Sequence, residues 1–307
     1  MPPHHGNDAD HKAPVSTHGG NDHPHAHGRH GAGAHSASHG HTMPGAPEPV
    51  ADPKPGQGHF GQGYGQDPDK LDPRDRIVDR EVVNATPHYS LHAVFKTVLP
   101  FPKDEQSQRS DVEQLLSALD ATGVEIRGWY DVSGFRADAD LLFWGLADST
   151  DTLQAANQAI LNSELGVNLE RVWNVMSGHM VAEFSPYHLP ACFDGVGPRD
   201  YAAVYPFNRS FDWYWLQAEK RQDMLKRHGM NGLNHLDVKI STLAAFAISD
   251  YEWSITLEHD DVARLMSVLR TQRAVEARVY TREDTPMFAG KRMELIDWVK
   301  RQPAEEY

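Results

Sequence analysis

After residue 75, hydrophobic and polar positions either alternate or recur at helical spacing along most of the chain. The segment HYSLHAVFKTVL (88 to 99) is rich in aromatic and β-branched residues and stops at a proline, which is typical of a strand. Ser110 and Glu113 have the spacing of a capping box, and the leucines that follow recur at helical spacing. This pattern predicts an amphipathic helix that ends at Gly123.

The next segments continue this alternation of strand and helix patterns. They predict strands at 124–132 and 138–147, a helix at about 150–161 and a strand at 171–184. The resulting order, β-α-β-β-α-β, is that of a ferredoxin-like unit.

The same order recurs in the second half of the chain. The predicted elements are a strand at 202–207, a helix from Trp215 to His228 with Gly229 as its C-cap, strands at 238–248 and 252–258, a helix capped by Asp260 or Asp261, and a closing strand near Arg278 to Thr281. Neither half can bury its sheet alone, so both should pack together. We therefore expect one α+β domain over residues 76–307, a dimeric α+β barrel of two ferredoxin-like repeats (about 88–184 and 200–290).

Residues 1–75 have a different composition, dominated by Gly, His, Pro, Ala, Asp and Ser. Such a segment buries too little apolar area to offset the entropy of ordering it, so a disordered tail is expected. Twelve of the 19 histidines lie there, and imidazoles at this density can bind Zn, Ni or Cu loosely. The alternative is a solvated extension with a compositional bias and no catalytic role, which the irregular spacing favours.

The overall composition excludes several classes of protein. A net charge of −14 argues against a nucleic-acid or anionic-membrane surface. A single cysteine, Cys192, rules out an intramolecular disulfide and fits a reducing cytoplasm. The start shows no signal-peptide pattern, and no run of about 18 apolar residues occurs, so we expect a cytoplasmic protein without a membrane span.

Candidate chemistry gathers between Tyr201 and Gly229. This stretch contains Tyr205, Arg209 and the aromatic cluster at 213–215, and His188 lies seventeen residues before Tyr205. A phenol, imidazoles and a guanidinium among aromatic residues would suit an iron-porphyrin with acidic side chains. Taken singly, each residue has an ordinary interpretation as well: a core tyrosine, a loop histidine, or a histidine favoured by a helix C-terminus.

The order of His188, Tyr205 (in VYPFNRS) and His228 (in MLKRHG) resembles the coproheme decarboxylases of the chlorite dismutase superfamily. The chain is most similar to their actinobacterial type, which carries a distal histidine. The segments RGWYDVSGFRADADLLFW, AISDYEW and MFAG support the match, which covers about residues 76 to 295.

The resemblance implies a role for each of these residues. His228 matches the axial ligand of the iron, for which imidazole Nε2 is the usual donor. Tyr205 matches the redox-active catalytic tyrosine, which becomes a radical and takes a hydrogen atom from a propionate. His188 matches the distal histidine, which can serve as general acid and base toward H2O2.

Three further residues are matched to the porphyrin end of the site. Arg209 and Arg273 can pair with propionates through bidentate hydrogen bonds, although Arg273 can also be read as part of a solvated helix face. Trp213 is expected in or beside the pocket wall, where substrate contact and plain core packing are not separable. An acceptor should fix the tautomer of His228, and Glu276 is the candidate by rough alignment.

The resemblance further implies a haem-biosynthetic oxidoreductase. Fe-coproporphyrin III (coproheme) would be substrate and redox cofactor together. Two equivalents of H2O2 would convert two propionates to vinyl groups through a three-propionate intermediate, giving haem b. The family's usual assembly is a homopentamer, and a ferrochelatase and haem acceptors are plausible transient partners.

Two alternatives remain open at this point. The first is a chlorite dismutase or general haem peroxidase on the same fold. Chlorite dismutases carry a distal arginine where this chain has Ile240, or Ser241 with a different gap, and this disfavours chlorite chemistry. The second is a haem or metal carrier without enzymatic activity, which would have no need of Tyr205.

Overall fold

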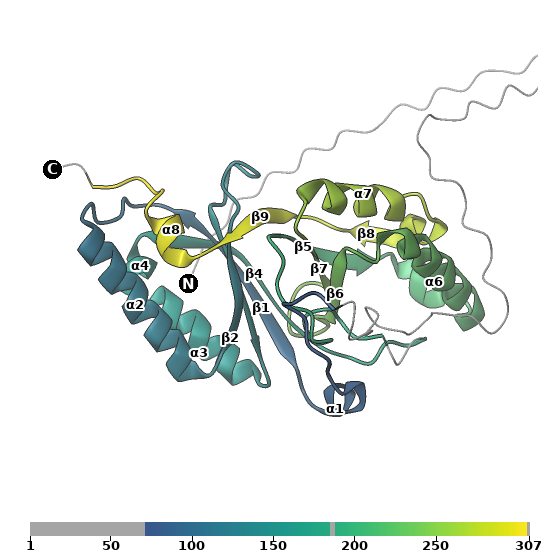
Figure 1. The fold of residues 1–307 in the computed structure, drawn as a ribbon. Coiled ribbons are helices and arrows are strands. Elements are labelled where there is room, and N and C mark those ends of the chain that lie inside the picture. The colour runs from purple at the N-terminus through teal and green to yellow at the C-terminus, as the bar shows by residue number, and fades with distance from the viewer. Residues whose placement is uncertain (1–70, 185–187, 306–307) are drawn as a thin grey trace, which may run out of the picture. The chain divides into compact units, whose positions relative to one another are not determined.

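The computed structural model of the chain describes residues 71–184 and 188–305, so the predicted tail lies outside the described residues except for its last few positions. The described chain has a mixed α+β fold built on one large antiparallel sheet with helices packed on it (Figure 1). None of the helices in these residues is both long and apolar enough to cross a membrane.

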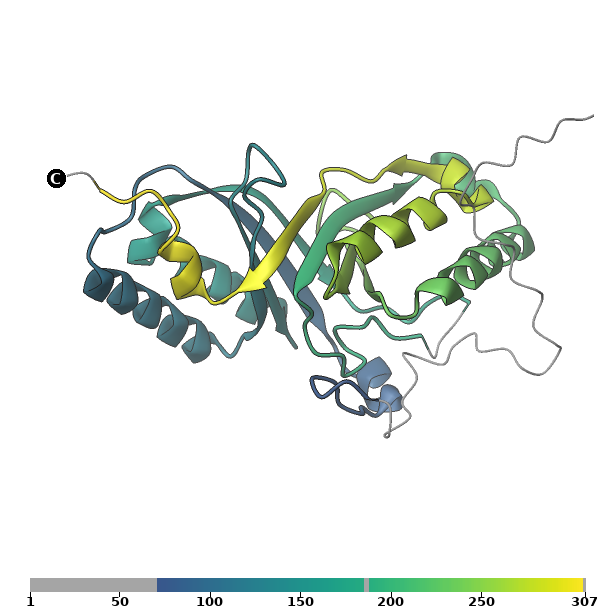
Figure 2. The same cartoon turned by 45° about the horizontal axis from the view of Figure 1, so that its top comes forward.

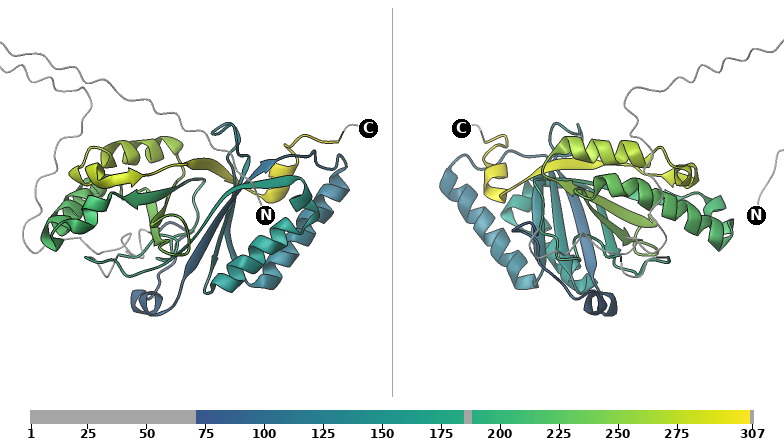
Figure 3. Two further views of the ribbon diagram at one scale, coloured as in Figure 1. Left: turned by 180° about the vertical axis from the view of Figure 1, so that it is seen from behind. Right: turned by 45° about the vertical axis from the view of Figure 1, so that its right-hand side comes forward.

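The first half of the fold follows the predicted order of strands and helices. Its elements are α1 (Arg80–Ala85), β1 (Tyr89–Thr97), α2 (Glu105–Thr122), β2 (Glu125–Asp131), β3 (Leu141–Ala147), α3 (Thr150–Leu161), α4 (Glu164–Val167) and β4 (Leu169–Gly178). Helices α2 and α3 lie side by side on one face of these strands (Figure 3). They bury Leu115 and Leu153 against Leu91 and Phe143, which removes the apolar face of the sheet from water.

The second half carries most of the candidate residues. Its elements are β5 (Tyr201–Arg209), α5 (Phe211–Trp215), α6 (Ala218–Gly232), η2 (Leu233–His235), β6 (Lys239–Ala244), β7 (Trp253–His259), α7 (Val262–Gln272), η3 (Glu276–Tyr280), β8 (Thr281–Glu283), β9 (Phe288–Met293) and α8 (Leu295–Val299). Helices α6 and α7 contact each other beside β5, as Figure 2 shows.

The sheet joins the two halves. Its strand order is β7-β6-β4-β1-β3-β2-β9-β5-β8, and β7 also pairs with β5. Within the described residues, this last pairing turns eight of the nine strands into a closed circuit. Strand β9 connects the halves, because Met293 pairs with Trp129 of β2 while Ala289 pairs with Ala203 of β5 (Figure 2).

Several predicted boundaries are confirmed. Helix α3 covers 150–161 as expected, Gly123 ends α2 in a left-handed conformation with φ of 80°, and Asp261 is the residue that caps α7. Glycine is favoured at such a helix end because it carries no Cβ to clash in the left-handed region.

Other boundaries were predicted wrongly. Helix α2 begins after Asp104, whose carboxylate accepts a hydrogen bond from the Ser107 amide at 2.7 Å, so Ser110 lies inside the helix and caps nothing. Strand β4 ends at Gly178, since its partner β1 begins opposite it at Tyr89. Helix α6 continues past Gly229, which adopts no left-handed conformation.

The closing strand was also misplaced. Residues 276–280 form the short helix η3, and the predicted stretch contributes only its last residue, Thr281, to the three-residue strand β8. The main closing strand is β9, further along the chain. Its segment contains no large apolar residue between Phe288 and Met293, so the alternation that signals a strand is weak there.

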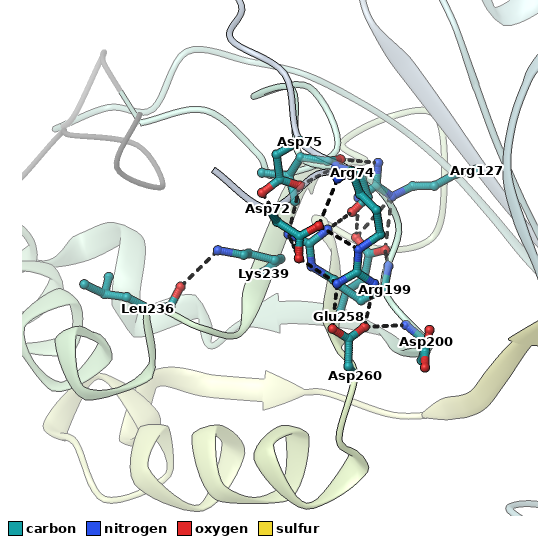
Figure 4. Close-up of polar contacts among 12 residues, drawn as sticks. Asp72, Arg74, Asp75, Arg127, Arg199, Asp200, Leu236, Lys239, Glu258 and Asp260 are labelled. Atoms are coloured by element: carbon teal, nitrogen blue, oxygen red, sulfur yellow. Dashed lines mark hydrogen bonds and ion pairs between the residues drawn. The ribbon is translucent and has the colours of Figure 1, made fainter. Parts of the chain in front are cut away.

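A buried ion pair holds β2 against β7. The Arg127 guanidinium lies 2.7 Å from the Glu258 carboxylate, with 3% and 0% of the two side chains exposed. Around it, Arg199 pairs with Asp75 at 2.8 Å and Arg74 pairs with Asp260 at 2.7 Å (Figure 4). The network therefore ties the segment around Arg74 and Asp75, at the end of the predicted tail, to both halves of the fold.

Candidate active site

Strand β5 presents two different faces. Ala202 and Val204 point into the cluster that contains Trp144, whereas Ala203 and Tyr205 pack against α7. Side chains alternate along a strand, so Phe207 shares the face of Tyr205, and the Arg209 guanidinium lies over the Phe207 ring on that same face. The sequence places the phenol and the guanidinium four residues apart, and the strand geometry brings them to one surface.

Tyr205 lies opposite Ile255 of β7 and is 7% exposed. Its hydroxyl makes no hydrogen bond within the described part of the chain. Burial raises the pKa of this phenol well above its ordinary value, and the charge of Asp284 raises it further, while Arg273 and Arg278 oppose the shift. The phenol is therefore protonated and keeps its hydrogen-bonding capacity unused.

Arg209 lies against aromatic rings. Its guanidinium carbon is 4.1 Å from the ring centroid of Trp213 and 4.7 Å from that of Phe207. Nη1 donates to the carbonyl of Ala277 at 3.0 Å. Burial lowers the pKa of Arg209 to about 10, so the group stays charged at neutral pH. One hydrogen bond leaves most donors of a guanidinium available for a carboxylate.

Trp213, in the short helix α5, is buried beneath that guanidinium. It packs with Met224 of α6 and Ala277 of η3, and its ring centroid is 5.8 Å from that of Tyr280. The indole thus packs against the Arg209 guanidinium and forms part of the local core.

His228 lies on α6, a helix in which Met224 is the buried residue. Its imidazole is half-buried and makes no hydrogen bond with any described residue. Burial lowers the pKa of His228 to about 4, and the charge of Arg209 contributes in the same direction. A neutral imidazole with a free ring nitrogen can act as a metal ligand.

The candidate partner of this imidazole, Glu276, makes no hydrogen bond with it among the described residues. Its carboxylate pairs with Arg227 at 3.3 Å and is 46% exposed. The polar side chain next to His228 is Gln272, whose Nε2 donates to the His228 carbonyl at 3.4 Å. In this structure Arg227, one residue before His228, pairs with Glu276, and the role of Glu276 as acceptor for the imidazole stays a prediction.

Arg273 is the C-cap of α7 and is not a merely solvated cation. Its Nη2 lies 2.8 Å from Asp284, and Arg278 of η3 lies 2.9 Å from the same carboxylate oxygen. Sequence reasoning missed Arg278 and Asp284. Arg278 was included in the wrongly predicted strand at 278–281, whereas it lies in the short helix η3, and Asp284 lies in the loop after β8. Neither segment shows a hydrophobic periodicity in the sequence.

His188 is not brought into this group by any described contact. The residues just before it, 185–187, lie outside the described part of the chain. Burial by the surrounding chain lowers its pKa, Asp194 opposes that shift and Arg80 adds to it. The charged groups that act on the His188 imidazole are therefore the two members of the Arg80–Asp194 ion pair.

The loop after His188 runs along β6. The Ala191 amide donates to the carbonyl of Ile240, and the Cys192 amide donates to the Ser241 hydroxyl. Ile240 packs against the cluster of Tyr205, whereas Ser241 is turned away from it. The apolar side chain of Ile240 therefore lies on the same face of the sheet as Tyr205.

These features fit an iron-porphyrin with carboxylate side chains. A single neutral imidazole is enough for an iron that a macrocycle already holds. On the face of Tyr205, the apolar side chains of Phe207, Ile240 and Trp253 are only partly covered. Arg209 lies at the end of β5, and Arg273 and Arg278 are near enough to Tyr205 to lower its pKa. The described residues contain no group of three or more His, Cys, Asp or Glu that could bind a free metal ion.

Comparison with known proteins supports the same conclusion. The family model described as chlorite dismutase matches residues 105–293. A coproheme decarboxylase of Mycolicibacterium smegmatis is 37% identical over 231 residues, which cover 74% of this chain and 99% of that protein. A coproheme decarboxylase of Thermus thermophilus is 28% identical over 188 residues, covering 56% of this chain and 74% of that protein.

Solved structures show the same fold. A chlorite dismutase from Candidatus Nitrospira defluvii in complex with imidazole matches with a TM-score of 0.62 at 19% identity, covering 73% of this chain and 99% of that one. A cyanide complex of a variant of that enzyme gives the same TM-score at 18% identity, over the same shares of both chains. The extent of the family match and the identity to the mycobacterial relative show that the chain belongs to the chlorite dismutase family.

Proposed function

We propose that this protein is a coproheme decarboxylase. It converts Fe-coproporphyrin III to haem b by oxidising two propionates to vinyl groups with H2O2. The observation that carries the proposal is the placing of Tyr205 and Arg209 on one face of β5, with the neutral His228 near enough for Arg209 to influence its pKa. The 37% identity to a coproheme decarboxylase over nearly its whole length supports the same activity.

Binding of coproheme is assigned to four residues. His228 would hold the iron through its imidazole, which burial keeps neutral over the physiological pH range. Arg209 and Arg273 pair with propionates, and Trp213 holds the Arg209 guanidinium in place from below. Coproheme serves as substrate and as redox group, so no separate organic cofactor is needed.

Tyr205 is assigned the oxidative step. As a radical, its phenol takes a hydrogen atom from the β-carbon of a nearby propionate, and loss of a second electron and of CO2 leaves the vinyl group. Each propionate, with one H2O2 and one proton, gives one vinyl group, one CO2 and two waters. Burial and the unpartnered hydroxyl support this role, since both keep the phenol protonated until it is oxidised.

A single tyrosine has to serve both propionates in turn. The reaction therefore passes through a three-propionate intermediate, which must turn or shift before the second oxidation. His188 is proposed as the acid and base that moves the H2O2 protons.

The apolar side chain of Ile240 on the face of Tyr205 weighs against chlorite chemistry. Isoleucine offers no positive charge to a chlorine oxyanion, whereas an arginine would. We therefore favour decarboxylation over chlorite dismutation within the same family.

The wider assignments rest on the family resemblance. The closed circuit of strand pairings supports the expected α+β barrel of two ferredoxin-like repeats. A homopentamer and transient contact with a ferrochelatase are part of the same proposal. They are testable by light scattering and by co-purification.

The function is tested by adding H2O2 stepwise to the purified protein with iron-coproporphyrin III under anaerobic conditions. Mass analysis should show two successive losses of the elements of formic acid (one CO2 and two hydrogens). An unchanged porphyrin mass despite tight binding would overturn the decarboxylase assignment. Rapid oxygen release from chlorite would instead establish the family's other activity.

A further inference from the structure

One carboxylate joins two arginines next to β5. Oδ2 of Asp284 lies 2.8 Å from Nη2 of Arg273 and 2.9 Å from Nη1 of Arg278. The Asp284 side chain is 16% exposed, less than either arginine. Because one oxygen accepts from both guanidiniums, it ties the end of α7, helix η3 and the loop after β8 to one point.

The strand register places this loop beside Tyr205. Glu283, at the end of β8, is opposite Asn208 of β5, and Phe288, at the start of β9, is opposite Val204. The connecting residues 284–287 therefore run along β5 between those two positions, past Tyr205. Met287 of this loop packs against the cluster that contains the tyrosine.

The charges of the three groups act on that phenol. Asp284 raises the pKa of Tyr205, and Arg273 and Arg278 both lower it. Two guanidiniums and one carboxylate leave a net charge of about +1 at this point, with unused N–H donors on both arginines. Such a group attracts a carboxylate and holds the two donors at a fixed separation.

We propose that Asp284 is a positioning residue that holds Arg273 and Arg278 as one carboxylate-binding pair beside Tyr205, and that this pair determines which propionate is placed against the tyrosine. The inference rests on the proposed function for the identity of the carboxylate. It goes beyond that function in naming a residue that touches neither iron nor the reacting atoms and yet directs the reaction.

A purely structural role for Asp284 is the competing interpretation. In that case the carboxylate only pins η3 to the loop after β8, and losing it would loosen the site and admit water. Hydration lowers the pKa of a buried phenol whichever partner is removed. Loss of the carboxylate or of an arginine would then shift the tyrosine in the same direction.

The sign of the shift can be measured without substrate. 3-Nitrotyrosine incorporated at position 205 gives an optical titration in an accessible pH range. Asp284→Asn should lower the pKa of the probe by about 0.5 to 1 unit, and Arg278→Gln should raise it by a similar amount. Asp284→Glu should restore the original value, and Glu283→Gln, whose carboxylate accepts from Asn208, should leave it unchanged.

Shifts in the same direction for Asp284→Asn and Arg278→Gln, or no shift for either, would overturn the proposal. If Asp284→Asn does not fold, Arg278→Gln and Arg273→Gln give the same test, since each should raise the pKa. The pKa of the probe is measured without turnover. A failure of the decarboxylase assignment can therefore be distinguished from a failure of this proposal.

The second readout uses coproheme and H2O2. Asp284→Asn should bind coproheme at least as tightly as the parent, because the site becomes more positive, while its turnover falls about tenfold or more. Its products should include a different three-propionate isomer, seen by chromatography against standards. Equal losses in binding and turnover, with the parent isomer alone, would show that Asp284 is merely structural.

Discussion

The Arg209 guanidinium stacks over the indole of Trp213, with its carbon 4.1 Å from the ring centroid. Burial lowers the pKa of the guanidinium to about 10, and the face of the aromatic ring partly compensates for the water that the cation loses. The stack thus keeps a desolvated cation in place at the position proposed for a propionate.

Replacing Arg209 by lysine should weaken coproheme binding by roughly 2- to 30-fold, because an ammonium loses the planar stack and the bidentate geometry. Absorbance titration of the porphyrin measures the effect. Arg282→Lys is the matched control, since Arg282 lies over Phe211, an exposed ring outside the site. Equal effects of the two substitutions would contradict this role of Arg209.

Glu258→Gln should destabilise the fold by about 3 to 5 kcal/mol, because it leaves the Arg127 charge buried without its partner. Arg109→Gln removes an exposed pair with Glu105 and should cost at most about 0.5 kcal/mol. Denaturant unfolding of both variants gives the comparison. Similar losses for the two would mean that the buried pair does not hold β2 and β7 together.

Gly195→Ala should cost at least ~2 kcal/mol more than Gly134→Ala. Both glycines have positive φ, 73° and 78°, so both alanines meet the same backbone strain. At Gly195 a Cβ would also clash with the carbonyl oxygen of Arg76, whereas Gly134 has open space. Thermal unfolding of the two variants gives the comparison. Equal stabilities would mean that the backbone of Arg76 does not pack closely against Gly195.

His92 should make stability depend on pH in the acid range. Burial lowers the pKa of its imidazole to about 3, and Arg127 adds to the shift. Between the ordinary value near 6.5 and about 3, the unfolded chain binds a proton that the folded chain excludes. Stability therefore falls as the pH falls through this window, and the contribution of His92 is constant above it.

His92→Gln should flatten this dependence by up to about 1.4 kcal/mol per pH unit. Urea unfolding of the apo protein from pH 4 to 8 tests the point. The difference in stability between parent and variant should be constant at the upper end, and the parent should lose stability relative to the variant toward the acid end. Parallel curves throughout would mean that His92 has the same pKa in the folded and the unfolded chain.

Sequence patterns predicted the elements better than their ends. The order of the first half and the bounds of α3 follow from periodicity and capping. The start of α2 does not, because Asp104 and Ser110 both satisfy a capping pattern and only the folded chain decides between them. The end of α6 was misplaced since a glycine inside a helix looks the same in sequence as a glycine at its end.

Individual site residues were harder to predict than the elements that carry them. Tyr205 and Arg209 share a face because strands alternate, which the sequence already implied. Asp284 reaches Arg273 only through the pairing of β8 and β9 with β5, and no local pattern records such a contact. The partner of Glu276 depends on side-chain directions on α6 and η3, so the sequence could not distinguish Arg227 from His228.

The most direct test of the proposed function compares Tyr205→Phe with Tyr201→Phe. Both tyrosines lie on β5 and face the same side, and only Tyr205 is proposed to react. With coproheme bound and H2O2 added stepwise, Tyr205→Phe should bind with unchanged affinity and release no CO2, while Tyr201→Phe should give haem b as the parent does. Formation of haem b by Tyr205→Phe at the parent rate would contradict the central role of this tyrosine.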